Sequence, residues 1–176
     1  MTIAQGQSFF EGARFDVIRV SLPTSDGSVI LRDACVSADA VVILPLLDER
    51  TVVLIRNERF AVDQTLWELP AGTIEPSEQP TPCAQRELIE ETGYEAATVD
   101  PLIDFYPSPG ICTEKMHAFV ARGLSHVGQQ LEPNERITVE AIPLDRSIQM
   151  VKDNTIRDGK TIATLLYYHT FDRSAV

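Results

Sequence analysis

The chain has 176 residues, of which 44% are hydrophobic and 23% charged, a composition typical of one soluble globular domain. Its net charge of −11 argues against a nucleic acid partner, because a polyanion would be repelled over a broad surface. No apolar run is long enough to span a membrane, and the N-terminal stretch MTIAQGQSFFEGARF lacks the basic start and long apolar run of a signal peptide. We therefore expect a cytoplasmic protein that does not contact a membrane.

Three cysteines without a CxxC pair argue against a disulfide framework and against a zinc site. We expect Cys35, Cys83 and Cys112 to be small buried side chains instead.

The N-terminal part of the chain is predicted to be a β-hairpin. Residues 14–22 alternate in polarity and are rich in β-formers, a turn cluster follows at 24–28, and residues 29–36 are predicted as a second strand. We assign residues 1–37 to a β extension and residues 38–176 to the main domain.

The main domain is predicted to mix strands and helices. Two buried strands are expected first, at 38–47 and 51–56, with Pro45 weakening the end of the earlier one. The later elements are a helix at 80–92, strands at 97–106, 116–121 and 137–143, a polar loop at 127–136, and helices at 145–153 and 159–170. This order predicts an α/β sandwich with a mixed sheet.

The helix predicted at residues 80–92 has recognisable ends. Prolines suit its first turn, where a missing N–H costs nothing, and Gly93 fits a left-handed position after its last residue. Either Ser77 or Thr81 is expected to cap its start.

Three carboxylates share one face of this helix. Glu87 lies three residues before Glu90 and four before Glu91, and like charges at these spacings repel by a few tenths of a kcal/mol per pair. The last two also lie near the negative end of the helix dipole. A hard divalent cation such as Mg²⁺, which prefers carboxylate and water oxygens, would make this crowding tolerable. The alternative is a solvated acidic face.

The surrounding positions favour the metal site. Residues 72–94 read Gly-x5-Glu-x7-Arg-Glu-Leu-x-Glu-Glu-x-Gly-Tyr. This segment, called the box below, resembles the box of the Nudix hydrolases, which cleave nucleoside diphosphates linked to another group. The resemblance implies the Nudix fold, an α/β/α sandwich with a mixed sheet, and Mg²⁺ as cofactor with Mn²⁺ as a substitute.

The resemblance also implies roles for single residues. The expected metal ligands are Glu87, Glu90, Glu91 and the backbone carbonyl of Ala71. Arg86 would orient these carboxylates through an ion pair with Glu78, and Gly72 would permit backbone geometry that a Cβ forbids. In the ADP-ribose relatives the general base is a glutamate on a late loop, where Glu135 aligns best and Glu132 is the second choice. Both could instead be solvated loop charges.

Segments outside the box bear on the substrate. The sequence WELPAG at residues 67–72 resembles the entrance to the box in ADP-ribose pyrophosphatases. Pro109 lies about where that subfamily carries a marker proline. A rigid turn at Pro109 and Gly110 would shape a loop over the sugar side of the site, although a generic turn between strands is the alternative.

Two arginines are candidate phosphate ligands. Arg56 and Arg59 match the outer positions of an Arg-Gln-aromatic-Arg pattern in related enzymes, but Asn57 and Glu58 replace the inner two. Arg59 would hold a phosphate through paired N–H donors, whereas Glu58 makes the local charge less favourable. Glu114 is a further candidate for a substrate or metal contact.

The C-terminal residues 156–161 resemble GDP-mannose pyrophosphatases as well as ADP-ribose enzymes. The expected activity is therefore Mg²⁺-dependent hydrolysis of a nucleoside diphosphate sugar, first of all ADP-ribose to AMP and ribose 5-phosphate. GDP-mannose or another nucleotide sugar is the next candidate. A nucleoside triphosphate pyrophosphohydrolase and a non-catalytic nucleotide-binding domain are the rival hypotheses. A homodimer is implied because such enzymes often exchange an N-terminal segment.

Overall fold

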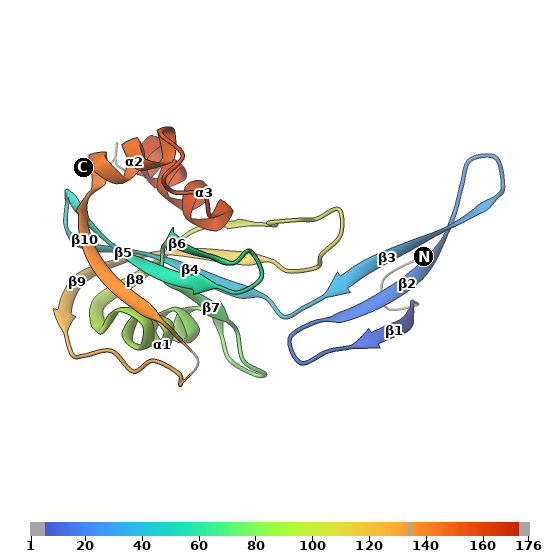
Figure 1. The fold of residues 1–176 in the computed structure, drawn as a ribbon, viewed down its shortest axis with the longest axis horizontal. Coiled ribbons are helices and arrows are strands. Elements are labelled where there is room, and N and C mark those ends of the chain that lie inside the picture. Colours follow the sequence, from blue (N-terminus) through green and yellow to red (C-terminus); the bar gives the residue numbers. More distant parts are fainter. Residues whose placement is uncertain (1–5, 134, 173–176) are drawn as a thin grey trace.

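The computed structural model describes residues 6–133 and 135–172 and contains two separate β-sheets (Figure 1). The first five residues, on which part of the signal-peptide argument depends, lie outside the described residues. Within the described part of the chain, no helix combines the length and apolar character needed to cross a bilayer.

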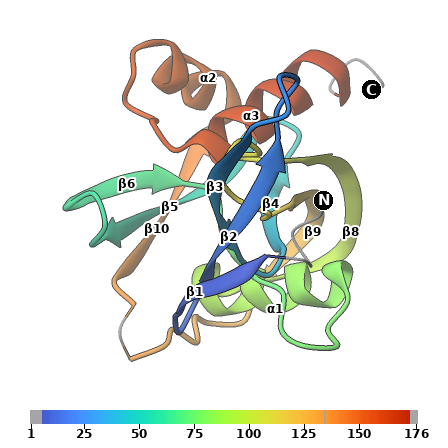
Figure 2. The same cartoon turned by 90° about the vertical axis from the view of Figure 1, so that its right-hand side faces the viewer.

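The N-terminal sheet extends away from the rest of the molecule (Figure 1), and it lies in front of the main domain in Figure 2. It consists of the antiparallel strands β1 (Gln7–Glu11), β2 (Asp16–Pro23) and β3 (Val29–Val36). The predicted hairpin is the pair β2–β3. Strand β1 was not predicted, because all five of its residues are exposed and no alternation of polarity marks it.

The main sheet has seven strands and mixed directions. Its central order is β10-β5-β4-β9-β8, with β6 pairing β5 and β7 pairing β4, and only the pair β4–β9 is parallel among the described strands. The strands are β4 (Ala40–Asp48), β5 (Thr51–Arg59), β6 (Gln64–Glu68), β7 (Ala71–Thr73), β8 (Tyr94–Phe105), β9 (Met116–His126) and β10 (Ile137–Pro143).

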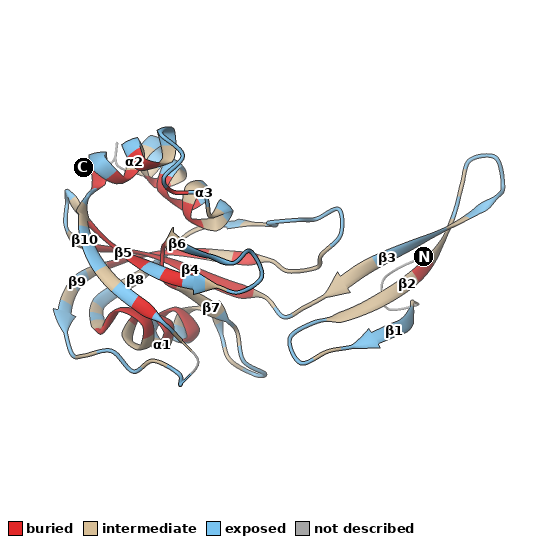
Figure 3. Ribbon diagram, in the orientation of Figure 1, coloured by how far each residue is buried: buried red, intermediate tan, exposed pale blue. Residues whose placement is uncertain are grey.

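Helices cover both faces of this sheet (Figure 1). Helix α1 (Pro80–Thr92) lies on one face, and α2 (Leu144–Lys152) and α3 (Gly159–Tyr167) lie on the other. Successive residues of a strand point to opposite faces, so Val41 packs toward α1 whereas Val42 packs toward α2 and α3. Each helix layer has buried residues on its sheet-facing side (Figure 3). The predicted α/β/α sandwich is confirmed.

Several elements differ from the sequence-based prediction. Strand β8 begins at Tyr94 rather than 97, β9 continues to His126 rather than ending at 121, and β6 and β7 were not predicted. Pro45 does not weaken the end of its strand: β4 continues to Asp48, and Pro45 pairs with Ala121 in the parallel register. The last helix ends as α3 at Tyr167 and continues as a π-helical turn, η2 (Tyr168–Asp172).

The cysteines only partly follow the prediction. All three are free thiols, but only Cys83 is buried, whereas Cys35 and Cys112 are half-buried and lie opposite each other in a parallel bridge. Around this bridge the Cys35 N–H donates to the Ile111 carbonyl at 2.7 Å, and the Thr113 N–H donates to the Cys35 carbonyl at 3.0 Å. These bonds attach the N-terminal sheet to the β8–β9 connection.

Candidate active site

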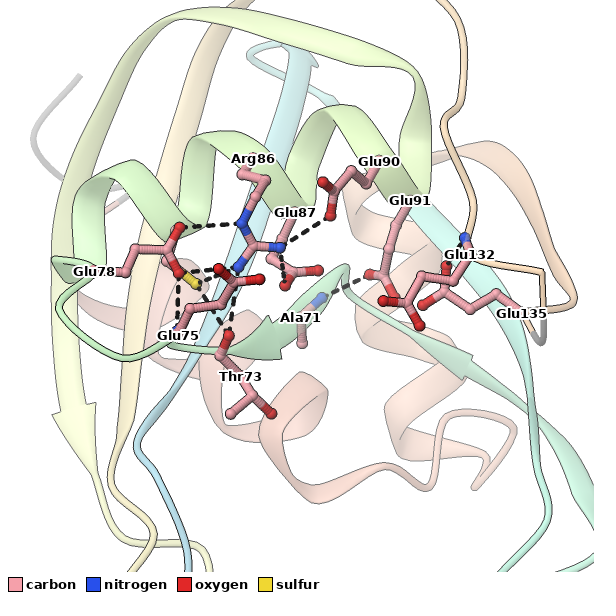
Figure 4. A network of polar contacts seen from close by, with 11 residues as sticks. Ala71, Thr73, Glu75, Glu78, Arg86, Glu87, Glu90, Glu91, Glu132 and Glu135 are labelled. Atoms are coloured by element: carbon pink, nitrogen blue, oxygen red, sulfur yellow. Dashed lines mark hydrogen bonds and ion pairs between the residues drawn. The ribbon is translucent and has the colours of Figure 1, made fainter. Parts of the chain in front are cut away.

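Helix α1 carries the predicted carboxylates on the face turned toward the β6–β7 junction (Figure 4). It begins with prolines in its first turn, and Gly93 ends it in the left-handed region with φ 74°. The predicted side-chain cap is wrong: the N-cap is Gln79, without a capping side-chain bond, and Ser77 instead has a positive φ of 72°.

Gly72 is required by lack of space. An added Cβ would lie 1.9 Å from the carboxyl carbon of Glu87. The predicted reason, a backbone geometry that a Cβ forbids, is wrong, because Gly72 does not have a positive φ; the obstacle is the Glu87 side chain. The glycine therefore lets strand β7 lie directly against the carboxylate face of the helix.

A single guanidinium organises much of the carboxylate cluster (Figure 4). Arg86 donates from Nε and Nη2 to the two oxygens of Glu78, each at 3.0 Å. Its Nη1 donates to Glu87 Oε1 at 2.7 Å and to Glu90 Oε2 at 2.9 Å. The hydrogen bonds from Arg86 are the main reason that the pKa of Glu78 falls to about 2. The predicted ion pair with Glu78 is thus present and extends to two of the proposed ligands.

Glu91 is held separately and is almost fully buried. The Ala71 N–H donates to its Oε2 at 2.8 Å, and only 3% of the residue is exposed. Burial raises its pKa to about 8, and burial also raises the pKa of Glu87. A nearby cation would favour the ionised form of both groups.

Each of the three helix carboxylates has one fixed oxygen and one oxygen without a hydrogen bond among the described residues. The unbonded atoms are Glu87 Oε2, Glu90 Oε1 and Glu91 Oε1. Because every fully buried side-chain oxygen in the described part of the chain has a partner, these three retain access to solvent. Among the described residues, no three metal-binding side chains lie close enough together to form a complete metal site. A cation would therefore share its coordination with water and substrate oxygens.

The loop before β10 brings further carboxylates to the same place. Figure 4 shows Glu132 and Glu135 beside Glu91, and the charge of Glu135 contributes to the raised pKa of both Glu87 and Glu91. The loop is closed by its own turn, in which the Glu132 N–H donates to Glu135 Oε2 at 2.9 Å. Seven predicted site residues thus lie in one region: Ala71, Arg86, Glu87, Glu90, Glu91, Glu132 and Glu135.

Arg59 occupies a second charged cluster. Its Nε and Nη2 donate to the two oxygens of Glu68 at 2.8 and 2.7 Å, while Lys160 Nζ lies 2.5 Å from Glu68 Oε2 and 3.0 Å from Asp158 Oδ1. The Glu68 side chain is 1% exposed, whereas that of Arg59 is 37% exposed. Sequence reasoning did not single out Glu68, and a glutamate within the apolar run WEL was the available signal.

The remaining substrate candidates are more dispersed. The Arg56 guanidinium lies over the Trp67 ring at 5.4 Å from its centroid. Glu114 is half-buried, its pKa is raised by burial, and the charge of Lys160 opposes that shift. Pro109 and Gly110 lie on the exposed β8–β9 connection, and among the described residues no backbone hydrogen bond joins them to the carboxylate cluster.

Glu58 forms an exposed ion pair with another arginine, Arg136. Its carboxylate lies 3.6 Å from Arg136, and both side chains are exposed.

A mixed sheet that packs an acidic, arginine-ordered helix on one face and two C-terminal helices on the other defines an α/β/α sandwich of the Nudix type. The family model described as NUDIX domain matches residues 36–165, and the chain belongs to the NUDIX family. The resemblance seen in the box is thereby confirmed.

Relatives cover most of the chain. It is 32% identical to an ADP-ribose pyrophosphatase of Bacillus subtilis, over 94% of this chain and 90% of that protein. It is 33% identical to a methanol dehydrogenase activator of Bacillus methanolicus (92% and 88%) and 38% identical to a GDP-mannose pyrophosphatase of Citrobacter koseri (74% and 73%). A solved structure described as an ADP compounds hydrolase has the same fold, with a TM-score of 0.86, 22% identity and coverage of 99% and 95%.

Proposed function

We propose that the protein hydrolyses the pyrophosphate bond of a nucleoside diphosphate sugar with a divalent cation. ADP-ribose is the first candidate substrate, giving AMP and ribose 5-phosphate, and GDP-mannose is the second. The names of the relatives support this substrate class. The observation that carries the proposal is the set of three helix carboxylates, each held at one oxygen and open at the other.

Mg²⁺, or Mn²⁺ in its place, fits this donor set because hard cations prefer carboxylate oxygens. When bound, it would neutralise the charge of the pyrophosphate and activate a water for attack. Glu87, Glu90 and Glu91 would hold it, together with the Ala71 carbonyl. Arg86 keeps two of these carboxylates in position, which limits the reorganisation that binding requires.

The loop supplies the proposed general base. Glu135 lies beside Glu91 and would accept the proton of the attacking water, with Glu132 as the second candidate (Figure 4). Glu135 is half-buried whereas Glu132 is exposed, which favours Glu135.

The substrate would be held by side chains outside the box. Arg59 already uses the paired donors Nε and Nη2 for Glu68, so instead of the expected paired contact its Nη1 would donate to a phosphate oxygen. Arg56 and Glu114 are the other proposed contacts, and the turn at Pro109 and Gly110 would border the sugar.

A homodimer formed through the N-terminal sheet is part of the proposal. This sheet exposes large apolar side chains, with Phe9 67%, Phe10 52% and Phe15 47% exposed. Such a patch commonly marks an interface. The proposed compartment is the cytoplasm, because all three cysteines are free thiols.

A panel of substrates with product identification tests the proposed function. ADP-ribose, GDP-mannose, other nucleotide sugars and a nucleoside triphosphate would be incubated with the full chain and Mg²⁺. We expect a nucleoside monophosphate and a sugar phosphate from at least one nucleotide sugar. Cleavage of the triphosphate alone would contradict the proposal, and the absence of any turnover would favour the non-catalytic alternative.

A further inference from the structure

The segment that follows β9 docks onto the C-terminal end of the box helix. The N–H groups of Val127 and Gly128 donate to the Gly93 carbonyl at 2.8 and 3.1 Å, and the Gln130 N–H donates to the Glu90 carbonyl at 3.0 Å. A helix end leaves carbonyls without partners, and residues 127–130 provide donors for them.

One side chain joins this docking. The Gln129 carboxamide donates from Nε2 to the Glu91 carbonyl at 2.7 Å. Gln129 is otherwise an exposed residue, so this bond holds a side chain that solvent would leave free. Its donor also meets the negative end of the helix dipole, where positive groups are favoured.

The absence of a side chain at Gly93 allows residues 128–129 to approach the end of the helix closely. An added Cβ would lie 2.7 Å from the Gln129 nitrogen and 2.9 Å from the Gly128 carbonyl carbon. The glycine is needed for its φ of 74° and also for the approach of the segment. The position of residues 128–129 relative to the helix is therefore tightly determined.

The docked segment leads directly into the loop that carries Glu132 and Glu135. Both side chains lie beside Glu91 (Figure 4), whose backbone carbonyl is the group that Gln129 binds. We propose that Gln129 is a positioning residue, whose bond to the Glu91 carbonyl holds the loop so that the Glu135 carboxylate faces the helix carboxylates. The kinetic part of this inference rests on the proposed hydrolase function, whereas the docking itself does not.

Gln129→Met is the primary test, because it keeps the length of the side chain and removes the donor. We expect kcat to fall about three- to tenfold, the equivalent of one neutral hydrogen bond, with KM and the Mg²⁺ dependence unchanged. Gln129→Lys restores a donor at the helix end and should recover most of the activity. Gln130→Met is the matched control, because only the backbone of Gln130 bonds to the helix.

A double-mutant cycle separates positioning from a general structural role. If Gln129 acts through Glu135, adding Gln129→Met to Glu135→Gln should lower kcat less than twofold further. The same loss in both backgrounds would overturn the inference.

Hydrogen exchange gives a readout that does not depend on turnover. In the metal-free protein, Gln129→Met should speed exchange of the amides of residues 127–132 and leave the core strands unchanged. Unchanged protection of this segment would overturn the inference. If no substrate of the panel is cleaved, the proposed function fails while the exchange measurement still decides whether Gln129 anchors the loop.

Discussion

Two charged clusters lie on the same domain, and they differ in charge balance. In the Arg59 cluster, two cations meet two carboxylates, with Glu68 fully buried between Arg59 and Lys160 and with Asp158 completing the set. In the box cluster, Arg86 is the one cation that forms ion pairs with the carboxylates in the described part of the chain. It binds three of them, and Glu91 and Glu135 lie close by (Figure 4).

The difference indicates which cluster is complete within the chain. A buried ion pair with both partners present needs no further charge, although removing one partner leaves the other uncompensated. The box cluster keeps an excess of negative charge that burial makes costly, as the raised pKa of Glu91 shows. We therefore assign stability to the first cluster and cation binding to the second, and the following experiments test that division.

Glu91→Gln should have the largest effect of these variants. It should lower activity and leave stability unchanged. Loss of one carboxylate ligand is expected to lower kcat about 10³-fold, close to 4 kcal/mol, because Mg²⁺ supplies several kcal/mol of charge stabilisation. The midpoint of urea unfolding, measured in chelator, should not fall. The amide oxygen still accepts from the Ala71 N–H, and the substitution leaves no buried cation without its partner.

The exposed Glu95 in β8 provides the matched control, and Glu95→Gln should leave turnover unchanged. Turnover of the Glu91→Gln enzyme near the wild-type rate with Mg²⁺ present would show that Glu91 is not a metal ligand.

Glu68→Gln should act mainly on stability, and because Glu68 orients the proposed phosphate contact Arg59, KM should rise as well. Removing the buried partner of Arg59 and Lys160 is expected to cost about 3 kcal/mol of unfolding free energy, at the low end for buried pairs because Arg59 retains some solvent. Urea unfolding measures this loss.

The control for this variant lies in the adjacent strand. Glu58→Gln removes an exposed carboxylate 3.6 Å from Arg136, and it should cost no more than about 1 kcal/mol. If Glu68→Gln and Glu58→Gln were equally stable, the assignment of a stabilising role to the Arg59 cluster would be wrong.

The box cluster could be predicted from sequence, whereas the Arg59 cluster could not. Glu87, Glu90 and Glu91 share a helix, so spacing alone places them on one face. Lys160 reaches Glu68 across 92 positions of sequence, and no local pattern marks such a contact. The bond from Gln129 to the Glu91 carbonyl crosses 38 positions and escapes prediction for the same reason.

The fold shows a similar division. Periodic segments such as β3 and β10 were predicted with their observed bounds. Strand β1 has no alternation, and it becomes a strand only because β2 offers a partner. Pro45 was misjudged because a parallel partner strand and a register irregularity between Leu46 and Asp48 are tertiary features.

Gly72→Ala should affect both properties moderately. Its Cβ would meet the Glu87 carboxylate, so β7 or the side chain must shift, at about 2 kcal/mol. Activity should fall as well, because Glu87 can no longer keep its oxygen beside the other ligands. Gly110→Ala is the control, because nothing lies within 4 Å of its added Cβ. A Gly72→Ala protein as stable and active as the control would mean that the close approach is unimportant.

The last expected effect is a pH dependence of stability in the metal-free protein. The pKa of Glu91 rises from 4.5 to about 8 on folding, mainly because of burial, so the folded state binds the proton more tightly than the unfolded state does. This contribution is complete below pH 4.5 and is lost as the pH rises toward 8. Relative to Glu91→Gln, the wild-type protein in chelator should lose stability throughout this window, by at most about 1.4 kcal/mol per pH unit. Saturating Mg²⁺ should abolish the difference in slope, because a bound cation favours the ionised carboxylate. Urea midpoints of both proteins at several pH values test this, and a wild-type stability that rises with pH relative to the variant would contradict the charge imbalance assigned to the box cluster.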